Sequence, residues 1–146
     1  MAKFRFAFLL QLAQDEREDA SRAMQAAQAA WLQGQAKLEQ VDSFRAEYRG
    51  RLASSAQTGM SVTQWRDFQL FLAKLDTAAI QQSEEVNRLS AVYEERKVQW
   101  LECEKKVKAF EALRVRHEQN EISRENRREQ KILDEFNSRP RSNSGH

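Results

Sequence analysis

Cysteine, proline and glycine are scarce in this sequence. Its 146 residues contain one cysteine, one proline and four glycines. A single cysteine, Cys103, cannot form an intrachain disulfide, which excludes a disulfide scaffold and favours a reducing compartment. So few glycines and prolines exclude a loop-rich β-sandwich or barrel, because those folds reverse the chain at many tight turns.

Long apolar runs and an excess of one charge are also missing. The longest apolar run lies near residues 6–10, which is too short to cross a bilayer, and no small-residue cleavage site follows it. The formal net charge of +2 offers no electrostatic case for nucleic-acid binding. We therefore expect a soluble cytoplasmic protein with no nucleic-acid partner and no direct membrane insertion. The basic stretch at residues 3–6 is either a point of membrane contact or the frayed end of a helix.

No motif for catalysis or ligand binding is present. The sequence has no glycine-rich phosphate loop. Neither His117 nor His146 has a second histidine or a cysteine at metal-ligand spacing, and no base is placed beside Cys103. The carboxylates alternate with lysine and arginine at helical spacing, which is typical of a solvated face. We expect no catalytic residue, no metal, no cofactor and no enzymatic activity.

What the sequence does contain is the composition and periodicity of a coiled coil. Alanine, arginine, glutamate, leucine and lysine make up about half of it, as in long helices. Two segments show apolar residues at alternating spacings of three and four, which indicates a left-handed coiled coil. The seam positions of the first are Phe6, Leu10, Ala13, Arg17, Ala20, Met24, Ala27, Trp31, Gly34, Leu38, Val41, Arg45, Tyr48 and Leu52. Those of the second are Trp65, Phe68, Leu72, Leu75, Ala79, Gln82, Val86, Leu89, Tyr93, Arg96, Trp100, Cys103, Val107 and Phe110.

The sequence between the two segments predicts how they are joined. Ser61 and Gln64 match a capping box at the start of the second helix, with Met60 and Trp65 as its hydrophobic staple. A short turn forces the helices antiparallel. We predict an all-α fold, a long two-helix antiparallel coiled-coil hairpin with an overhanging C-terminal helix. It forms a single domain over residues 1–137, with helices at about 4–53 and 62–137 around a turn at 54–61, and residues 138–146 are a disordered tail.

The position of the turn predicts the register. A hairpin tip near residues 57–59 places Tyr48 opposite Phe68 and Gly34 opposite Gln82. The same register places Met24 opposite Tyr93 and Phe6 opposite Phe110. The second helix then continues for about 40 Å beyond this last pair. Thirteen of residues 111–137 are charged, so this overhang is either a solvated helix held by charge pairs or a segment that a partner covers.

Some bulky apolar residues lie beside the seam. Phe44 and Phe71 both fall at heptad position g, on the same side of the predicted hairpin, and Leu70 falls on the outer face. Such residues either widen the seam or form a docking patch.

Three sequence blocks resemble the flagellar export protein family FliJ. They are residues 46–52, residues 63–80 and residues 125–136, and their order and spacing agree with that family to about Arg139. The resemblance implies a small cytoplasmic component of the flagellar type III export apparatus, held at the cytoplasmic face of the inner membrane through that apparatus. It also implies a coiled coil like the γ stalk of a rotary ATPase. Such a stalk couples the ring of the flagellar export ATPase to the cytoplasmic domain of the membrane export gate, and it handles export chaperones.

The resemblance also implies where partners bind. The gate-binding surface maps onto Val41, Phe44, Tyr48, Phe71, Leu75 and Ala78. Lys37 and Gln82 depart from the family pattern, which has a glutamine and a histidine there. We expect the ATPase ring to contact the terminal end through Leu113, Arg124, Asn126, Arg127, Gln130 and Phe136. The alternatives are an injectisome stalk, a generic coiled-coil chaperone or scaffold without an ATPase partner, and an independent homodimer.

Overall fold

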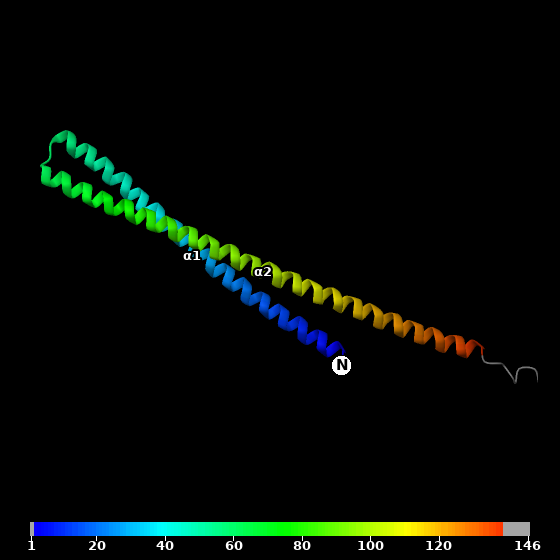
Figure 1. Cartoon of the computed structure of the whole chain (residues 1–146). Helices are drawn as coiled ribbons and strands as arrows, with labels where there is room; N and C mark the ends of the chain where they lie inside the picture. The colour runs from blue at the N-terminus through cyan, green and yellow to red at the C-terminus, as the bar shows by residue number, and fades with distance from the viewer. Residues whose placement is uncertain (1, 139–146) are drawn as a thin grey trace, which may run out of the picture. The chain divides into compact units, whose positions relative to one another are not determined.

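The chain folds as two long antiparallel helices. The computed structural model describes the backbone of residues 2–138 and the side chains of residues 5–138. Helix α1 spans Ala2–Thr58 and helix α2 spans Val62–Ser138, with three residues between them (Figure 1). The predicted all-α coiled-coil hairpin is confirmed, and α2 extends past the start of α1 as expected. The proposed tail lies outside the described residues, apart from Ser138, which is helical.

The contacts divide the chain into two compact units, each containing a part of both helices. The hairpin unit consists of residues 16–103 and includes the turn. The terminal unit consists of residues 1–15 and 104–146. In the terminal unit, the start of α1 packs against the second half of α2.

The turn is shorter than the sequence predicts. It covers residues 59–61 rather than 54–61, because alanine, serine and glutamine at 53–57 allow α1 to continue to Thr58. The Thr58 hydroxyl donates to the carbonyl oxygens of Ser54 and Ser55, at 3.4 and 3.2 Å, and so satisfies carbonyls of the last helical turn. Gly59 follows with a φ of 95°, in the left-handed region that favours glycine. The helix therefore ends where the chain can reverse without strain.

The predicted capping box starts α2. The Ser61 hydroxyl accepts a hydrogen bond from the Gln64 backbone N–H at 3.1 Å, and Gln64 Oε1 accepts one from the Ser61 N–H at 3.2 Å. This reciprocal pair satisfies two backbone donors that the first helical turn would otherwise leave unpaired.

Replacing Ser61 with alanine is expected to lower the free energy of unfolding by about 1 kcal/mol, because one capping bond is lost. Thermal unfolding followed by circular dichroism measures the effect. Ser83→Ala, an exposed change inside α2, is the control and is expected to leave the midpoint unchanged or raise it slightly. Equal midpoints for the two variants would show that the capping box contributes nothing to stability.

The predicted seam is the face on which the helices pack. All fourteen predicted positions of α1 are buried or half-buried, and so are thirteen of the fourteen in α2. The exception is Trp65, which is 42% exposed in the first turn of α2. The most deeply buried apolar residues are Leu10, Ala13 and Val107 in the terminal unit, and Leu52, Leu72 and Ala79 in the hairpin unit.

The predicted register is only partly right. The Tyr48 and Phe68 rings are 6.0 Å apart, and Gln82 Nε2 donates to the Gly34 carbonyl oxygen at 3.0 Å, so these two pairs are confirmed. Tyr93, however, stacks on Trp31 at 5.5 Å, although its predicted partner is Met24. Trp31 is seven residues from Met24, so at this pair the register differs from the prediction by a full heptad, and the prediction is wrong here. The turn is also centred on Met60 rather than on Thr58, which moves the partners on α2 further along that helix.

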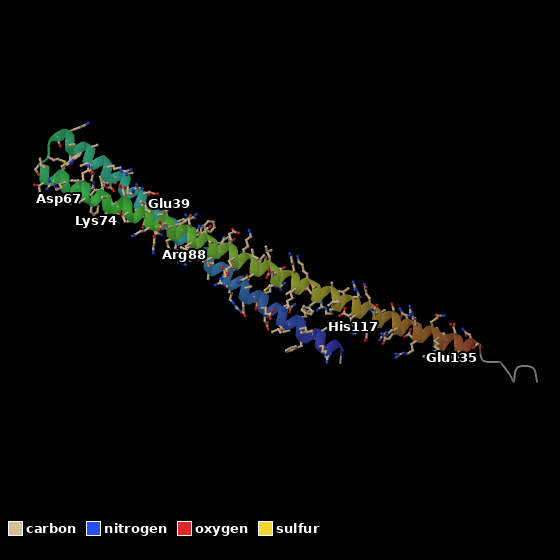
Figure 2. The ribbon with its side chains drawn as sticks, in the orientation of Figure 1. Glu39, Asp67, Lys74, Arg88, His117 and Glu135 are labelled. Atoms are coloured by element: carbon tan, nitrogen blue, oxygen red, sulfur yellow. The ribbon has the colours of Figure 1, made fainter. Side chains whose placement is uncertain are left out.

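The same correction applies in the terminal unit. Phe6 lies against His117, with ring centroids 5.5 Å apart, and not directly opposite Phe110 as predicted. Figure 2 labels His117 on the part of α2 beside the start of α1. Phe110 packs instead on the cluster of Leu10, Ala13 and Val107. The part of α2 without a helix beside it therefore begins about two turns later than the sequence suggests.

Candidate interaction surfaces

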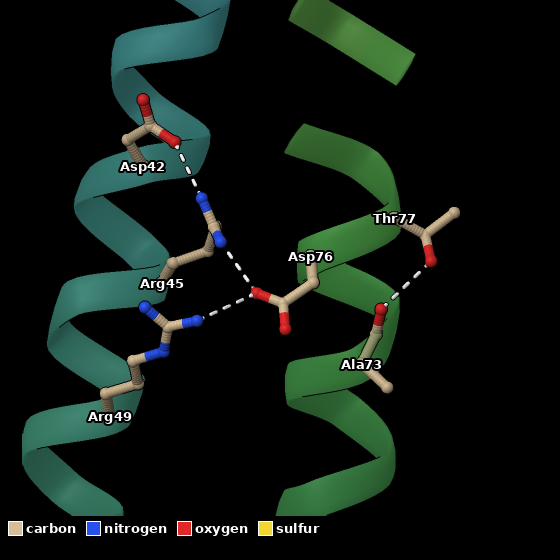
Figure 3. A network of polar contacts seen from close by, with 6 residues as sticks. All are labelled: Asp42, Arg45, Arg49, Ala73, Asp76 and Thr77. Carbon is tan, nitrogen blue, oxygen red and sulfur yellow. Dashed lines mark hydrogen bonds and ion pairs between the residues drawn. The ribbon is translucent and has the colours of Figure 1, made fainter. Parts of the chain in front are cut away.

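The hairpin unit has two chemically different flanks. Antiparallel pairing sets the g positions of the two helices side by side along one flank and the e positions along the other. Along the e flank, Asp76 Oδ1 of α2 accepts hydrogen bonds from Arg45 Nε at 2.8 Å and from Arg49 Nη2 at 3.2 Å (Figure 3). Arg45 Nη1 also donates to Asp42 Oδ1 at 3.2 Å. This flank is thus closed by an ion network between α1 and α2.

Arg45 links the seam to that network. It occupies a seam position, where an arginine looks like a defect, yet its guanidinium leaves the seam to meet the two carboxylates. Hydrogen bonds to Asp76 first, and to Asp42 second, raise the pKa of Arg45 above its ordinary value. Sequence reasoning missed the network, although an arginine in the seam beside an aspartate at an e position of the facing helix is a signal that could reveal it.

The g flank carries the predicted gate-binding residues, all within the hairpin unit. Phe44 is 54% exposed and Phe71 is 41% exposed, while Val41, Tyr48, Leu75 and Ala78 are half-buried. The structure brings Tyr48 and Phe71 together, with ring centroids 4.6 Å apart. Phe44 instead borders a shallow depression on α1, lined by Ala36, Glu39, Gln40, Ser43 and Glu47. Of the six predicted gate-binding residues, therefore, two are exposed aromatic residues and the other four are half-buried.

The two positions that depart from the family pattern have identifiable structural roles. Gln82 lies in the seam, where its amide binds the Gly34 carbonyl oxygen. Lys37 lies near Glu85. A hydrogen bond from Arg88 first, and the charges of Arg88 and Lys37 after it, hold the pKa of Glu85 below its ordinary value. Both positions thus contribute to pairing within the hairpin unit.

The predicted ring-binding residues all lie on α2 in the terminal unit, and all are exposed. At about 100° per residue, Leu113, Arg124 and Arg127 share one face of the helix. Asn126 lies roughly on the opposite face. Gln130 lies between the two faces, about 60° from Arg127, and its Nε2 donates to Asp134 Oδ1 at 3.2 Å. Phe136 lies about 140° around the helix from Leu113 and about 80° from Asn126, so the six residues do not form one surface. Leu113, Arg124 and Arg127 define what we call the basic face.

A groove in the terminal unit was not predicted. It has a volume of about 730 Å³. Its walls are residues of α1, namely Phe6, Ala7, Leu10, Gln11 and Gln14, and residues of α2, namely Arg114, His117, Glu118, Glu121, Ile122 and Glu125. Sequence reasoning missed it because the predicted register ended the pairing at Phe110. Ile122 could have revealed the groove, because it lies seven residues after Val115 and so continues an apolar face of α2 beyond Phe110.

The described residues give little support for bound metal or for membrane insertion. No three His, Cys, Asp or Glu side chains of residues 5–138 gather closely enough to hold a metal ion. Cys103 is half-buried in the seam. Neither α1 nor α2, over its described length, has a stretch apolar enough to cross a membrane.

Two long paired helices with exposed surfaces in both units define a coiled-coil interaction protein. The family model described as Flagellar FliJ protein matches residues 2–145, so the chain belongs to the flagellar FliJ family. It is similar to the flagellar FliJ protein of Escherichia coli (strain K12), with 29% identity over 133 residues, which cover 91% of this chain and 90% of that protein. It is also similar to the flagellar FliJ protein of Salmonella typhi, with 26% identity over 131 residues, which cover 90% and 89%.

Membership confirms the family resemblance seen in the three sequence blocks. It makes the chain a component of the flagellar export apparatus, in a family of non-catalytic components. The match is to flagellar proteins, so it favours the flagellar interpretation over an injectisome stalk.

Proposed function

We propose that this chain is the stalk-like coiled coil that couples the export ATPase ring to the export gate and also handles export chaperones. The proposal rests on one observation. Both units, which the same two helices run through, carry exposed residues that a partner could contact. The g-flank aromatic pair, Phe44 and Phe71, lies in the hairpin unit. The uncovered end of α2 lies in the terminal unit.

The physical basis is that a helix transmits force along its axis. Both α1 and α2 run through the two units without interruption. A partner that displaces or twists one unit therefore acts on the other through the backbone hydrogen bonds of two helices. Coupling further requires that the stalk contact the ring subunits differently in each of their states, since a ligand with equal affinity for all states shifts none of them.

The two surfaces are assigned to different partners. The terminal unit, through the basic face and the α2 end, binds the ATPase ring, and the g flank of the hairpin unit binds the cytoplasmic domain of the gate. These contacts place the protein in the cytoplasm at the inner face of the membrane without inserting it. Chaperones bind the same chain, so it can present them near the gate.

Deleting the residues after Glu125 is expected to abolish binding to the export ATPase while leaving gate binding intact. The deletion removes Asn126, Arg127, Gln130 and Phe136 but keeps His117, whose ring packs on Phe6. The start of α1 therefore remains covered, which a deletion after Phe110 would not achieve. Co-precipitation with the purified ATPase and with the gate domain measures both interactions.

ATP turnover by the purified ring provides the functional readout. The full chain is expected to raise turnover, whereas the shortened chain is not. Arg124→Glu with Arg127→Glu, made in the full chain, tests the basic face with the length of α2 preserved. A shortened chain that still binds the ATPase but loses the gate would reverse the assignment, and unchanged turnover with the full chain would favour a scaffold without an ATPase role.

A further inference from the structure

The groove of the terminal unit combines an apolar floor with an acidic rim. Phe6, Leu10 and Ile122 supply the apolar surface. Three carboxylates, Glu118, Glu121 and Glu125, line its α2 wall. Among the lining residues whose side chains the structure describes, Arg114 is the only lysine or arginine, and its Nε lies 4.0 Å from Glu118 Oε1.

His117, which lines the groove, adds a polar atom that has no hydrogen-bond partner. Its Nε2 is shielded from solvent, has no hydrogen-bond partner and lies 3.6 Å from Glu121 Oε1. The described residues of the groove therefore combine carboxylate oxygens, one imidazole and one arginine with an apolar centre.

The α2 wall of the groove continues as a stripe beyond the end of α1. Residues spaced alternately by four and three follow one side of the helix, and they are Glu118, Ile122, Glu125, Glu129, Ile132 and Phe136. The three apolar members are each more than half exposed. This is the spacing with which one helix packs against another, so the stripe resembles a seam on which no helix of the described residues 2–138 lies.

We propose that this acidic stripe receives a basic amphipathic helix from another protein, which enters the groove as a third helix and continues along α2. A helix is indicated by the four-three spacing and by the groove between two helices. Lysine or arginine on its flanks is indicated by Glu118, Glu125 and Glu129, which such residues would neutralise. A second copy of this chain is a poorer occupant, because two acidic stripes face to face would repel.

Of the residues assigned above to the ATPase ring, only Phe136 belongs to the acidic stripe. The basic face, with Arg124 and Arg127, lies roughly 140° around α2 from the centre of the acidic stripe. Two opposite faces of one helix with opposite charges can bind two partners at once. The inference therefore does not depend on which protein binds the basic face.

Two synthetic helices test the proposal with the full chain. The first has about 21 residues, roughly 30 Å of helix, with leucine at four-three spacing and lysine on both flanks. The second replaces every lysine with glutamate. Fluorescence anisotropy of each labelled peptide, at low and at high salt, measures binding. The lysine peptide is expected to bind at least about tenfold more tightly than the glutamate peptide, with the preference shrinking as salt rises.

Variants of the chain locate the binding. Glu118→Lys, Glu125→Lys and Glu129→Lys together are expected to reverse the peptide preference, while helicity measured by circular dichroism stays the same because these residues are exposed. The matched control, Arg124→Glu with Arg127→Glu on the opposite face, is expected not to weaken binding of the lysine peptide. Equal binding of both peptides, or a preference that survives the glutamate reversal, would overturn the proposal. The proposal would also be overturned if light scattering showed that the chain forms a dimer and that the three glutamate-to-lysine changes dissociate this dimer.

Discussion

A leucine in place of Gly34 is expected to destabilise the hairpin unit by about 2–3 kcal/mol, the usual cost of inserting bulk into a packed seam. A Cβ atom at this position would lie 2.9 Å from Leu89 Cδ1 and 3.5 Å from Val86 Cγ2. The rest of a leucine side chain has no room between these residues unless the helices separate. Separation would also break the hydrogen bond from Gln82 to the Gly34 carbonyl. Urea unfolding followed by circular dichroism measures the loss.

Two controls isolate the close approach at Gly34. Gly34→Ala adds only one methyl group, and the tip of Leu89 can rotate away from it. The gain in helix propensity of about 1 kcal/mol then roughly offsets the tighter contact. Gly50→Leu introduces the same leucine in the same helix, at a position with nothing within 4 Å, so it is expected to leave stability unchanged or to increase it. If Gly34→Leu proved as stable as Gly50→Leu, the close helix approach would be wrong.

The double change Phe44→Ala with Phe71→Ala is expected to weaken binding to the export-gate domain by at least about tenfold. Exposed aromatic side chains that fill a partner's pockets supply a large share of interface energy. Both residues lie outside the seam, so helicity and the unfolding midpoint are expected to change little. Titration calorimetry with the purified gate domain measures affinity, and swimming in soft agar measures the consequence for export.

The matched control is Leu32→Ala with Ile80→Ala. These residues are as exposed as the two phenylalanines, and one lies on each helix. They fall on the outer face, at heptad position b, about 150° around the helix from the g positions, so gate affinity is expected to remain normal. Unchanged motility in the phenylalanine variant would rule out the docking patch. Val41, Tyr48 and Leu75 are less suitable targets, because they are half-buried in the seam and their loss would also loosen the hairpin.

Local chemistry allowed much of this fold to be predicted. The three-four spacing of apolar residues predicted which face of each helix is buried, because a helix shows the same face every seven residues whatever its partner. The capping box at Ser61 was predictable for a similar reason, since its two hydrogen bonds join residues three apart. The three sequence blocks that resemble the FliJ family were recognisable from the amino-acid sequence itself. Of the candidate sites, the exposure of Phe44 and Phe71 followed from their g positions.

Other features depended on how the two helices meet. The heptad pattern repeats along both helices, so it is compatible with several registers, and the turn at residues 59–61 selected one of them. That register brought Asp76 to Arg45 and Arg49, Tyr93 to Trp31, and His117 to Phe6. The groove of the terminal unit exists only because α1 reaches that far along α2. Sequence alone determined the faces of the helices, since those depend on neighbours a turn away. Only the tertiary structure decided which residues face each other, because a shift in register changes partners, such as those of Tyr93 and Phe6, while leaving each helix the same.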